Sequence, residues 1–163
     1  MNLIVAADKN RGIGYKGKLL YNIPDDLKYF KEKTLGKAVV MGYNTLLSLP
    51  KSAPLRDRAN IVLVKDRIKI DGAAVVTSLE ELFEKLKKFN GNDVFVIGGQ
   101  SVYTQLAPHC EYAYITEIDA QAQADAFLEI GGGWETVEKS EERVHNNIKY
   151  KFCKYRNLNM KSI

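Results

Sequence analysis

Short apolar runs rich in β-branched residues alternate along the chain with longer segments of helical period. The runs cover residues 3–7, 38–42, 61–64, 73–76 and 94–99. They are continuous rather than interrupted by polar residues, as is typical of strands that are covered on both faces of a parallel sheet. Helical periodicity is found in residues 25–34, 79–89 and 100–106. The alternation of strands and helices predicts an α/β domain with right-handed crossovers.

The C-terminal part has a different pattern. Apolar and polar residues alternate more strictly in residues 112–116, 134–138 and 149–155, as expected of strands with one face in water. These strands are expected to include an antiparallel edge. Because no internal repeat or linker interrupts the pattern, we expect a single domain over residues 1–163.

The composition is that of a globular protein, with 163 residues of which 45% are hydrophobic and 27% charged. It excludes a disordered tail, a collagen-like fibre and a low-complexity linker. No apolar run approaches the roughly 18 residues of a membrane span, and no cleavable signal pattern opens the chain, so a cytoplasmic protein is expected. Cys110 and Cys153 make no disulfide framework, and His109 and His145 are too few for a zinc site. Both thiols are expected to be reduced and structural.

The net charge of +4 is unevenly distributed. Residues 1–70 hold 14 Lys and Arg against 6 Asp and Glu, whereas residues 71–163 hold 10 against 14. The first part should therefore attract anions. Its basic residues are scattered singly, without a Lys/Arg block or an aromatic RNA-binding signature, so nucleic acid is not the expected partner.

Asp26 is the first residue that suggests chemistry. Pro24 opens a helix, and the acidic residues Asp25 and Asp26 lie in its first turn, where they complement the helix dipole. That explanation suffices for Asp25. Asp26, however, shares a helix face with Leu27 and Phe30, which we expect to turn toward the interior. A carboxylate there needs a partner, and a capping or buried structural role stays open beside a functional one.

A strand, two glycines and a helix follow one another in residues 94–103. Glycines at such a junction let the backbone approach a ligand, and the first N–H groups of the helix can hold a phosphate. The alternative is a plain tight turn. This junction is not a G-x-G-x-x-G fingerprint, and no P-loop sequence occurs anywhere in the chain. In open α/β sheets the ligand crevice lies beyond the carboxyl ends of the strands, where Gly98 and Gly99 are placed.

Seven motifs in sequence order carry a family resemblance. They are Ile4-Val5-Ala6-Ala7, Gly12-Ile13-Gly14, Asn22-Ile23-Pro24-x-Asp26-Leu27-x-x-Phe30-Lys31, Val40-Met41-Gly42-x-x-Thr45, Arg58-x-Asn60-Ile61-Val62-Leu63, Val96-Ile97-Gly98-Gly99-x-x-Val102-Tyr103 and Thr116-x-Ile118-Asp119-Ala120. In this order and spacing the chain resembles dihydrofolate reductase of the bacterial type over nearly its whole length. The resemblance implies a doubly wound, mostly parallel eight-stranded sheet with an antiparallel C-terminal strand and helices on both faces.

The resemblance also implies an oxidoreductase that reduces 7,8-dihydrofolate to 5,6,7,8-tetrahydrofolate by hydride transfer from NADPH. Asp26 corresponds to the single ionisable residue of the pterin pocket, where it orients the ring and promotes protonation of N5 through its charge and ordered solvent. Thr116 corresponds to a threonine that braces this aspartate through water, and Arg58 to the arginine that binds the glutamate tail of folate. The apolar walls of the folate site correspond to Val5, Ala6, Leu27, Phe30, Leu49, Leu55 and Ile97.

The NADPH site is carried over in the same way. Two glycine turns, at Gly42 and at Gly98-Gly99, correspond to those that hold the pyrophosphate, and the Gly98-Gly99 peptide is cis in the family. Tyr103 corresponds to a tyrosine near the nicotinamide and contributes to both sites. Residues 12–20, called the lid below, resemble a mobile loop that closes over the nicotinamide, and Asp125 resembles an acid that steadies it. The cofactor contacts expected are Ala7, Ile13, Gly14, Leu19, Gly42, Tyr43, Asn44, Thr45, Leu63, Val64, Lys65, Gly98, Gly99, Gln100, Ser101, Val102 and Tyr103.

The chain departs from the family pattern in the shortened segment Asp125-Ala126-Phe127-Leu128 and at three single positions. Tyr21 stands where relatives carry a tryptophan of the pterin-site water network. Tyr43 and Ser101 replace two arginines that often bind the 2′-phosphate of NADPH. We expect Lys65 to be the principal contact of that phosphate, with Arg67 nearby.

Two other functions compete with this interpretation. One is a reductase of the same fold that acts on a ribosylated diaminopyrimidine, whose site would not need Asp26 or Arg58. The other is a catalytically silent binding protein that keeps only the scaffold. The expected partners are dihydrofolate and antifolate-like small molecules, with no membrane and no metal, and the chain is expected to be a monomer.

Overall fold

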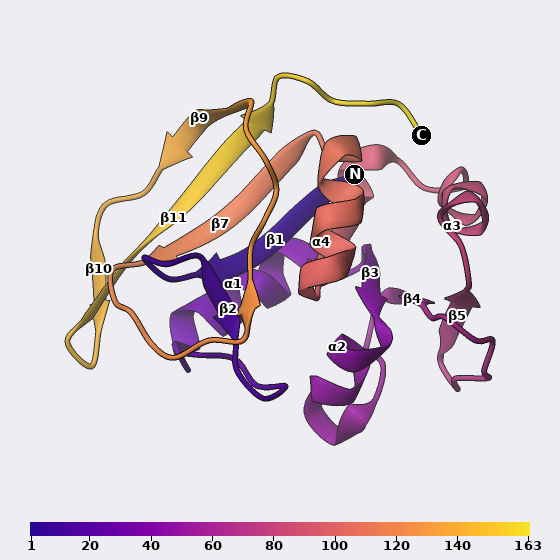
Figure 1. Cartoon of the computed structure of the whole chain (residues 1–163), viewed down its shortest axis with the longest axis horizontal. Helices are drawn as coiled ribbons and strands as arrows, with labels where there is room; N and C mark the ends of the chain where they lie inside the picture. Colours follow the sequence, from indigo (N-terminus) through magenta and orange to yellow (C-terminus); the bar gives the residue numbers. More distant parts are fainter.

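The computed structural model describes residues 1–163 and contains one central twisted sheet (Figure 1). Along the sheet the strands follow the order β10-β11-β7-β1-β6-β3-β4-β5. The six strands from β7 to β5 are parallel to one another. Their bounds are β1 Asn2–Ala7, β3 Ala38–Gly42, β4 Ala59–Leu63, β5 Ala73–Val76, β6 Val94–Gly98 and β7 Tyr112–Ile118.

The last strand, β11 (Ile148–Asn157), runs antiparallel to β7. Its other edge pairs with β9 (Trp134–Lys139) near the C-terminal end and with β10 (Arg143–His145) near the start. β9 and β10 therefore lie in series along one edge, so the sheet is eight strands wide. Between them, Ser140 keeps the edge paired by accepting from the Phe152 N–H through Oγ at 2.9 Å. This topology confirms the expected mostly parallel sheet with an antiparallel C-terminal strand.

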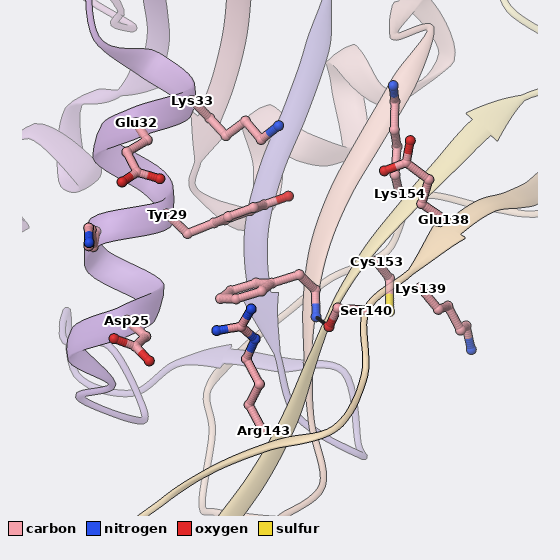
Figure 2. Close-up of a pocket in the computed structure, with 12 residues that line it drawn as sticks. Asp25, Tyr29, Glu32, Lys33, Glu138, Lys139, Ser140, Arg143, Cys153 and Lys154 are labelled. Atoms are coloured by element: carbon pink, nitrogen blue, oxygen red, sulfur yellow. Dashed lines mark hydrogen bonds between the residues drawn. The ribbon is translucent and has the colours of Figure 1, made fainter.

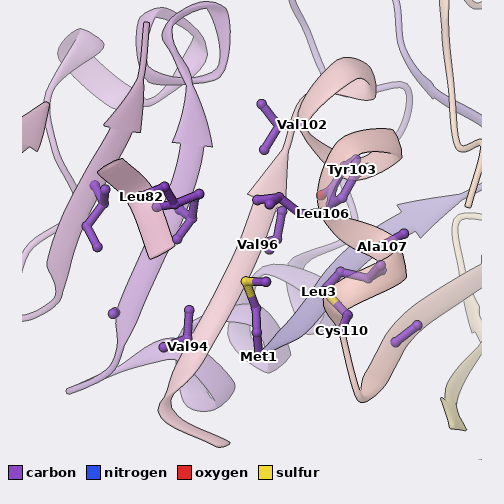
Figure 3. Packing of buried hydrophobic residues seen from close by; sticks show 14 of the residues in the cluster. Met1, Leu3, Leu82, Val94, Val96, Val102, Tyr103, Leu106, Ala107 and Cys110 are labelled. Atoms are coloured by element: carbon purple, nitrogen blue, oxygen red, sulfur yellow. The ribbon is translucent and has the colours of Figure 1, made fainter. Parts of the chain in front are cut away.

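Alternate residues of the central strands pack on opposite faces, which explains why these strands are apolar throughout. On β3, Val40 belongs to the larger core cluster, whereas its neighbour Val39 belongs to a separate cluster on the other face. The larger cluster joins the sheet to α3 (Leu79–Leu86) and α4 (Gln100–Leu106), as Figure 3 shows for Leu82 and Leu106 against Val96. The helices α1 (Pro24–Thr34) and α2 (Tyr43–Ser48) cover the opposite face.

Some elements differ from the sequence-based expectation. The helix predicted over residues 79–89 ends at Leu86, and the Phe89 N–H then closes a turn onto the Leu86 carbonyl at 3.0 Å. The helix α2 was not expected, and neither was a small sheet of β2 (Gly12–Gly14) and β8 (Ala126–Phe127). Single 3₁₀ turns lie at Pro50–Ser52, Gly91–Asp93 and Ala107–His109.

Both cysteines are buried and free, as expected from their spacing. Burial raises the pKa of the Cys110 thiol to about 12, and it raises the pKa of the Cys153 thiol as well. Neither thiol is therefore activated as a nucleophile. No helix combines the length and the apolar character needed to cross a bilayer.

Candidate functional site

Asp26 lies in the first turn of α1, which begins at Pro24 after an extended Ile23. Its side chain is half-buried and accepts a hydrogen bond at Oδ1 from the Thr116 hydroxyl, at 2.6 Å. Burial raises the pKa of Asp26, and the Thr116 hydrogen bond opposes part of that rise. The site thus contains a carboxyl group with a higher proton affinity than an ordinary aspartate.

Thr116 connects Asp26 to the middle of the sheet. It lies on β7, is only 2% exposed, and pairs in register with Ala6 of the neighbouring strand β1. The expected brace of Asp26 by Thr116 through water is here a direct hydrogen bond. Asp26 therefore lies over the carboxyl-terminal halves of β1 and β7, at the edge where α/β sheets hold their ligands.

The apolar residues assigned to the folate walls keep part of their surface accessible. Half-buried side chains from β1, α1, β6 and the segment after α2 are those of Val5, Ala6, Phe30, Leu49, Leu55 and Ile97. Leu27 was expected to turn inward but is 47% exposed, so that expectation was wrong. Thr34 is the only fully buried residue of α1, so the apolar side chains of this helix keep part of their surface accessible.

Arg58 lies directly before β4 and is half-buried without an ion pair. Its Nε atom is buried and has no hydrogen-bond partner, and burial lowers the pKa of its guanidinium group. The loop that carries it is held by Asn60, whose amide accepts from the Leu55 N–H at 2.9 Å and donates to the Leu55 and Arg58 carbonyls at 2.8 and 3.1 Å. A half-buried arginine without an ion pair, on a loop that is held in place, is suited to bind a carboxylate.

Two glycine turns meet at the carboxyl ends of β3 and β6. The Gly98-Gly99 peptide is cis, as the resemblance implied, and Gly98 has a φ of 128°. A Cβ at Gly98 would lie 3.3 Å from the Thr45 hydroxyl, and a Cβ at Gly42 would lie 3.1 Å from Val102. The two turns are therefore packed closely together and have no room for side chains between them.

Both glycine turns lead directly into helices. α2 follows Gly42 and α4 follows Gly99, and neither helix has a side-chain cap. The first N–H groups of a helix have no partner within the helix, so two sets of free donors lie beside the glycine backbone. This arrangement fits the pyrophosphate of a dinucleotide. Of the expected contacts near it, Tyr43 is 41% exposed and Ser101 is exposed as well.

The last residue of β4 and the residues that follow it differ in their exposure. Val64 is buried and donates its N–H to the Val76 carbonyl at 2.9 Å, Leu63 is half-buried, and Lys65 is exposed without an ion pair. Arg67 is already engaged, because its Nη2 contacts both carboxylate oxygens of Glu81 at 2.8 Å. Lys65 is thus the free cation at the end of this strand.

The lid is attached to the loop that contains Asp125. The Asp125 carboxylate accepts from the Lys16 N–H at 3.0 Å, and the Asp125 N–H donates to the Gly14 carbonyl, also at 3.0 Å. The half-buried Ile13 and Gly14 belong to β2, which pairs with β8. Leu19, an expected cofactor contact, is 67% exposed on the outer part of the lid.

Tyr103 and Ala7 are buried rather than at the surface of the site. Tyr103 is 3% exposed and donates its hydroxyl to the Ile4 carbonyl at 2.7 Å, and burial raises the pKa of this phenol. A Cβ at Gly98 would lie 3.4 Å from its ring. The Tyr103 ring therefore packs against the Gly98-Gly99 turn. Ala7 is 3% exposed and lies in the same core cluster as Tyr103.

Asp8 was not found by sequence reasoning, although it is 6% exposed and accepts hydrogen bonds from three backbone N–H groups. The signal that could have indicated it is a charged residue directly after an apolar strand, which is common and therefore not specific.

A groove of about 580 Å³ lies on another side of α1, between this helix and β9, β10 and β11 (Figure 2). Tyr29 stacks on Phe152 in this groove with 4.2 Å between ring centroids, and Lys33 and Arg143 lie over the two rings. Asp26 does not line it. Side chains of both charges surround this groove, and neither Thr116 nor Arg58 is among the residues that line it.

Known proteins resemble this chain over nearly its whole length. The sequence model of dihydrofolate reductase matches residues 1–157. The dihydrofolate reductase of Buchnera aphidicola is 32% identical over 157 residues, which cover 93% of this chain and 96% of that protein. The dihydrofolate reductase of Staphylococcus haemolyticus is 31% identical over 163 residues, covering 97% and 96%. The solved structure of the Enterococcus faecalis dihydrofolate reductase, complexed with NADP(H) and RAB-propyl, has a TM-score of 0.86 and 33% identity, covering 95% of this chain and 94% of that chain.

Proposed function

The chain belongs to the dihydrofolate reductase family, and we propose that it reduces 7,8-dihydrofolate to 5,6,7,8-tetrahydrofolate with NADPH, using Asp26 to orient the pterin and promote protonation of N5. The observation that carries this proposal is the half-buried Asp26 carboxyl group bonded to Thr116 at 2.6 Å. The reaction adds one hydride and one proton across the C6=N5 bond. NADPH supplies the hydride when bound.

Asp26 contributes by binding and by charge. A carboxylate with one oxygen fixed by Thr116 can accept hydrogen bonds from two adjacent N–H groups of a pterin, which sets the ring's orientation. Its raised pKa keeps a proton available near the ring at a higher pH than an ordinary aspartate would. C6 accepts a hydride more readily once N5 is protonated, so both effects favour reduction.

The apolar residues and Arg58 complete the substrate site in this proposal. Phe30, Leu49, Leu55 and Ile97 supply accessible apolar surface for the flat ring and the benzoyl group. Arg58, with its buried unpaired Nε, binds the α-carboxylate of the glutamate tail. The dinucleotide is held by the free N–H groups after Gly42 and Gly99, and its 2′-phosphate by Lys65.

The test is the loss of NADPH absorbance when the protein is mixed with dihydrofolate. We expect turnover with dihydrofolate and none with a phosphorylated, ribosylated diaminopyrimidine, which the rival reductase would consume. If the protein binds folate but does not oxidise NADPH, it is a catalytically silent binding protein, and the proposal is wrong.

A further inference from the structure

The buried carboxylate of Asp8 lies at the end of β1 and is not needed by the chemistry above. Its two oxygens have different partners. Oδ1 accepts from the N–H groups of Asn10 and Gly12 at 2.9 and 2.8 Å, whereas Oδ2 accepts from the Ala122 N–H at 3.2 Å and from the Tyr21 hydroxyl at 3.5 Å. Gly12 is the first residue of the lid, and Tyr21 directly follows its last residue. One side chain therefore contacts both ends of a loop that extends away from it.

Gly12 is packed tightly at the first of these ends. A Cβ at this position would lie 2.9 Å from Ala124, 3.0 Å from Leu20 and 3.1 Å from the Asp8 carboxylate. The backbone before it is also constrained, because Arg11 has a φ of 62° in the left-handed region. The Asp8 N–H donates to the Gly12 carbonyl at 3.1 Å, and the Arg11 N–H donates to the Asp8 carbonyl at 3.0 Å. Asp8 thus closes this turn with its backbone and its side chain together.

The second end leads directly to the helix that carries Asp26. Tyr21 is half-buried, and burial together with the neighbouring Asp8 raises the pKa of its phenol, so the hydroxyl stays a donor. The chain passes from Tyr21 through Asn22 and Ile23 into α1. The position of Tyr21 therefore affects both the lid and the start of α1.

We propose that Asp8 is a positioning residue that clamps both ends of the lid and fixes them to the loop at Ala122. This inference rests on the proposed function, because it gives the lid a role in the reaction. In this arrangement the outer part of the lid can move while its ends stay in place, since Asp125 alone holds its middle by a side chain. Asp8 touches neither substrate nor cofactor in this account.

The variant Asp8→Asn keeps the Oδ1 acceptor but replaces Oδ2 with an NH₂ group that cannot accept from Ala122 or Tyr21. Its matched control is Asp119→Asn, which removes a nearby exposed carboxylate that pairs only with Lys9 at 3.3 Å. Tyr21→Phe removes a single donor and keeps the ring. Hydrogen exchange of residues 12–22 is measured for each variant against the amides of β1 and β6, and kcat and KM are measured with NADPH and dihydrofolate.

We expect Asp8→Asn to accelerate exchange across residues 12–22 with the core strands unchanged, and to lower kcat about tenfold with a smaller change in KM for dihydrofolate. Asp119→Asn should change neither the hydrogen exchange of residues 12–22 nor kcat. Tyr21→Phe should accelerate exchange only near residues 20–22, and the double variant should lose less activity than the product of the single effects. If Asp8→Asn unfolds, the hydrogen exchange of residues 20–22 in Tyr21→Phe by itself tests whether Asp8 clamps the lid.

Unchanged lid exchange in Tyr21→Phe, or strictly multiplicative effects in the double variant, would overturn the clamp. The exchange measurement needs no turnover. If the wild-type protein fails to oxidise NADPH, the proposed function is contradicted. The exchange measurement still tests whether Asp8 clamps the lid.

Discussion

The Thr116 hydroxyl donates to the Asp26 carboxyl group at 2.6 Å and thereby joins the middle of β7 to the first turn of α1. The bond favours the ionised form of Asp26, whereas burial favours the protonated form, and burial has the larger effect on the pKa. This balance has consequences that can be measured at both residues.

Replacing Thr116 with valine removes the donor and leaves a side chain of similar shape. Without the hydrogen bond, the pKa of Asp26 should rise further, so the rate of hydride transfer should hold to a higher pH than in the wild type. The measurement is the pH dependence of the single-turnover rate. Thr116→Ser, which keeps the hydroxyl, is the control and should retain the wild-type profile. A Thr116→Val profile that moves to lower pH would contradict this assignment.

The free energy of unfolding should also report the burial of Asp26. An aspartate in the unfolded chain has a pKa of about 4, and the folded pKa is higher, so the folded state holds a proton over a range in which the unfolded state has lost it. Stability from the protonated group is thus fully present below the unfolded pKa and is lost as pH rises through the folded pKa. Asp26→Asn does not titrate.

Urea unfolding of both proteins over a pH series measures this difference. At neutral pH, Asp26→Asn should be the more stable protein, and its advantage should shrink as the pH falls through the raised pKa. A wild type that gains stability relative to the variant as the pH rises would show that the folded pKa is lowered instead.

Lys65 should determine the preference for NADPH over NADH. It is exposed and free of ion pairs, whereas its neighbour Arg67 is bound to Glu81. Because a charge-assisted contact to phosphate contributes about 1.5–3 kcal/mol, Lys65→Ala should lower the ratio of kcat/KM for the two cofactors by about tenfold or more. Arg67→Ala should leave the ratio nearly unchanged. An unaltered ratio in Lys65→Ala would remove this residue from the cofactor site.

Arg58 should act on the tail of the substrate and not on its ring. Arg58→Gln keeps a polar side chain but loses the charged fork, so KM for dihydrofolate should rise about tenfold or more with little change in kcat. A dihydropterin without the glutamate tail is the internal control, because its kinetics should be the same in both proteins. Equal losses with the two substrates would place Arg58 in a structural role.

Much of the fold could be predicted from the sequence because both faces of the central strands are covered. Val39 and Val40 are adjacent and both fully buried, on opposite sides of the sheet, so the apolar run over β3 indicated a parallel strand directly. The helix α2 was missed because six residues are too short to show a helical period. The division of one edge into β9 and β10 depends on the pairing of Ser140, which no local pattern encodes.

The parts of the candidate site that could be predicted are those where the local sequence pattern alone indicates a residue. Asp26 could be found because a carboxylate shared a helix face with apolar residues, and the glycines of the second turn because they separate a strand from a helix. Asp8 could not be found, since a charged residue directly after an apolar strand is common and its contact with Ala122 spans 114 positions along the chain. The exposure of Leu27 was also unpredictable, because helical spacing shows which residues share a face of the helix but not whether that face packs against the core.

The most direct test of Asp26 is the single-turnover rate of hydride transfer from NADPH to dihydrofolate, measured over a pH series in the wild type and in Asp26→Asn. At neutral pH the variant should fold, bind folates and lose about 100-fold or more of the rate, because general acid catalysis contributes on that order. The loss should shrink in acid, where the substrate is protonated in solution. Equal rates in the two proteins at neutral pH would contradict the central role of Asp26.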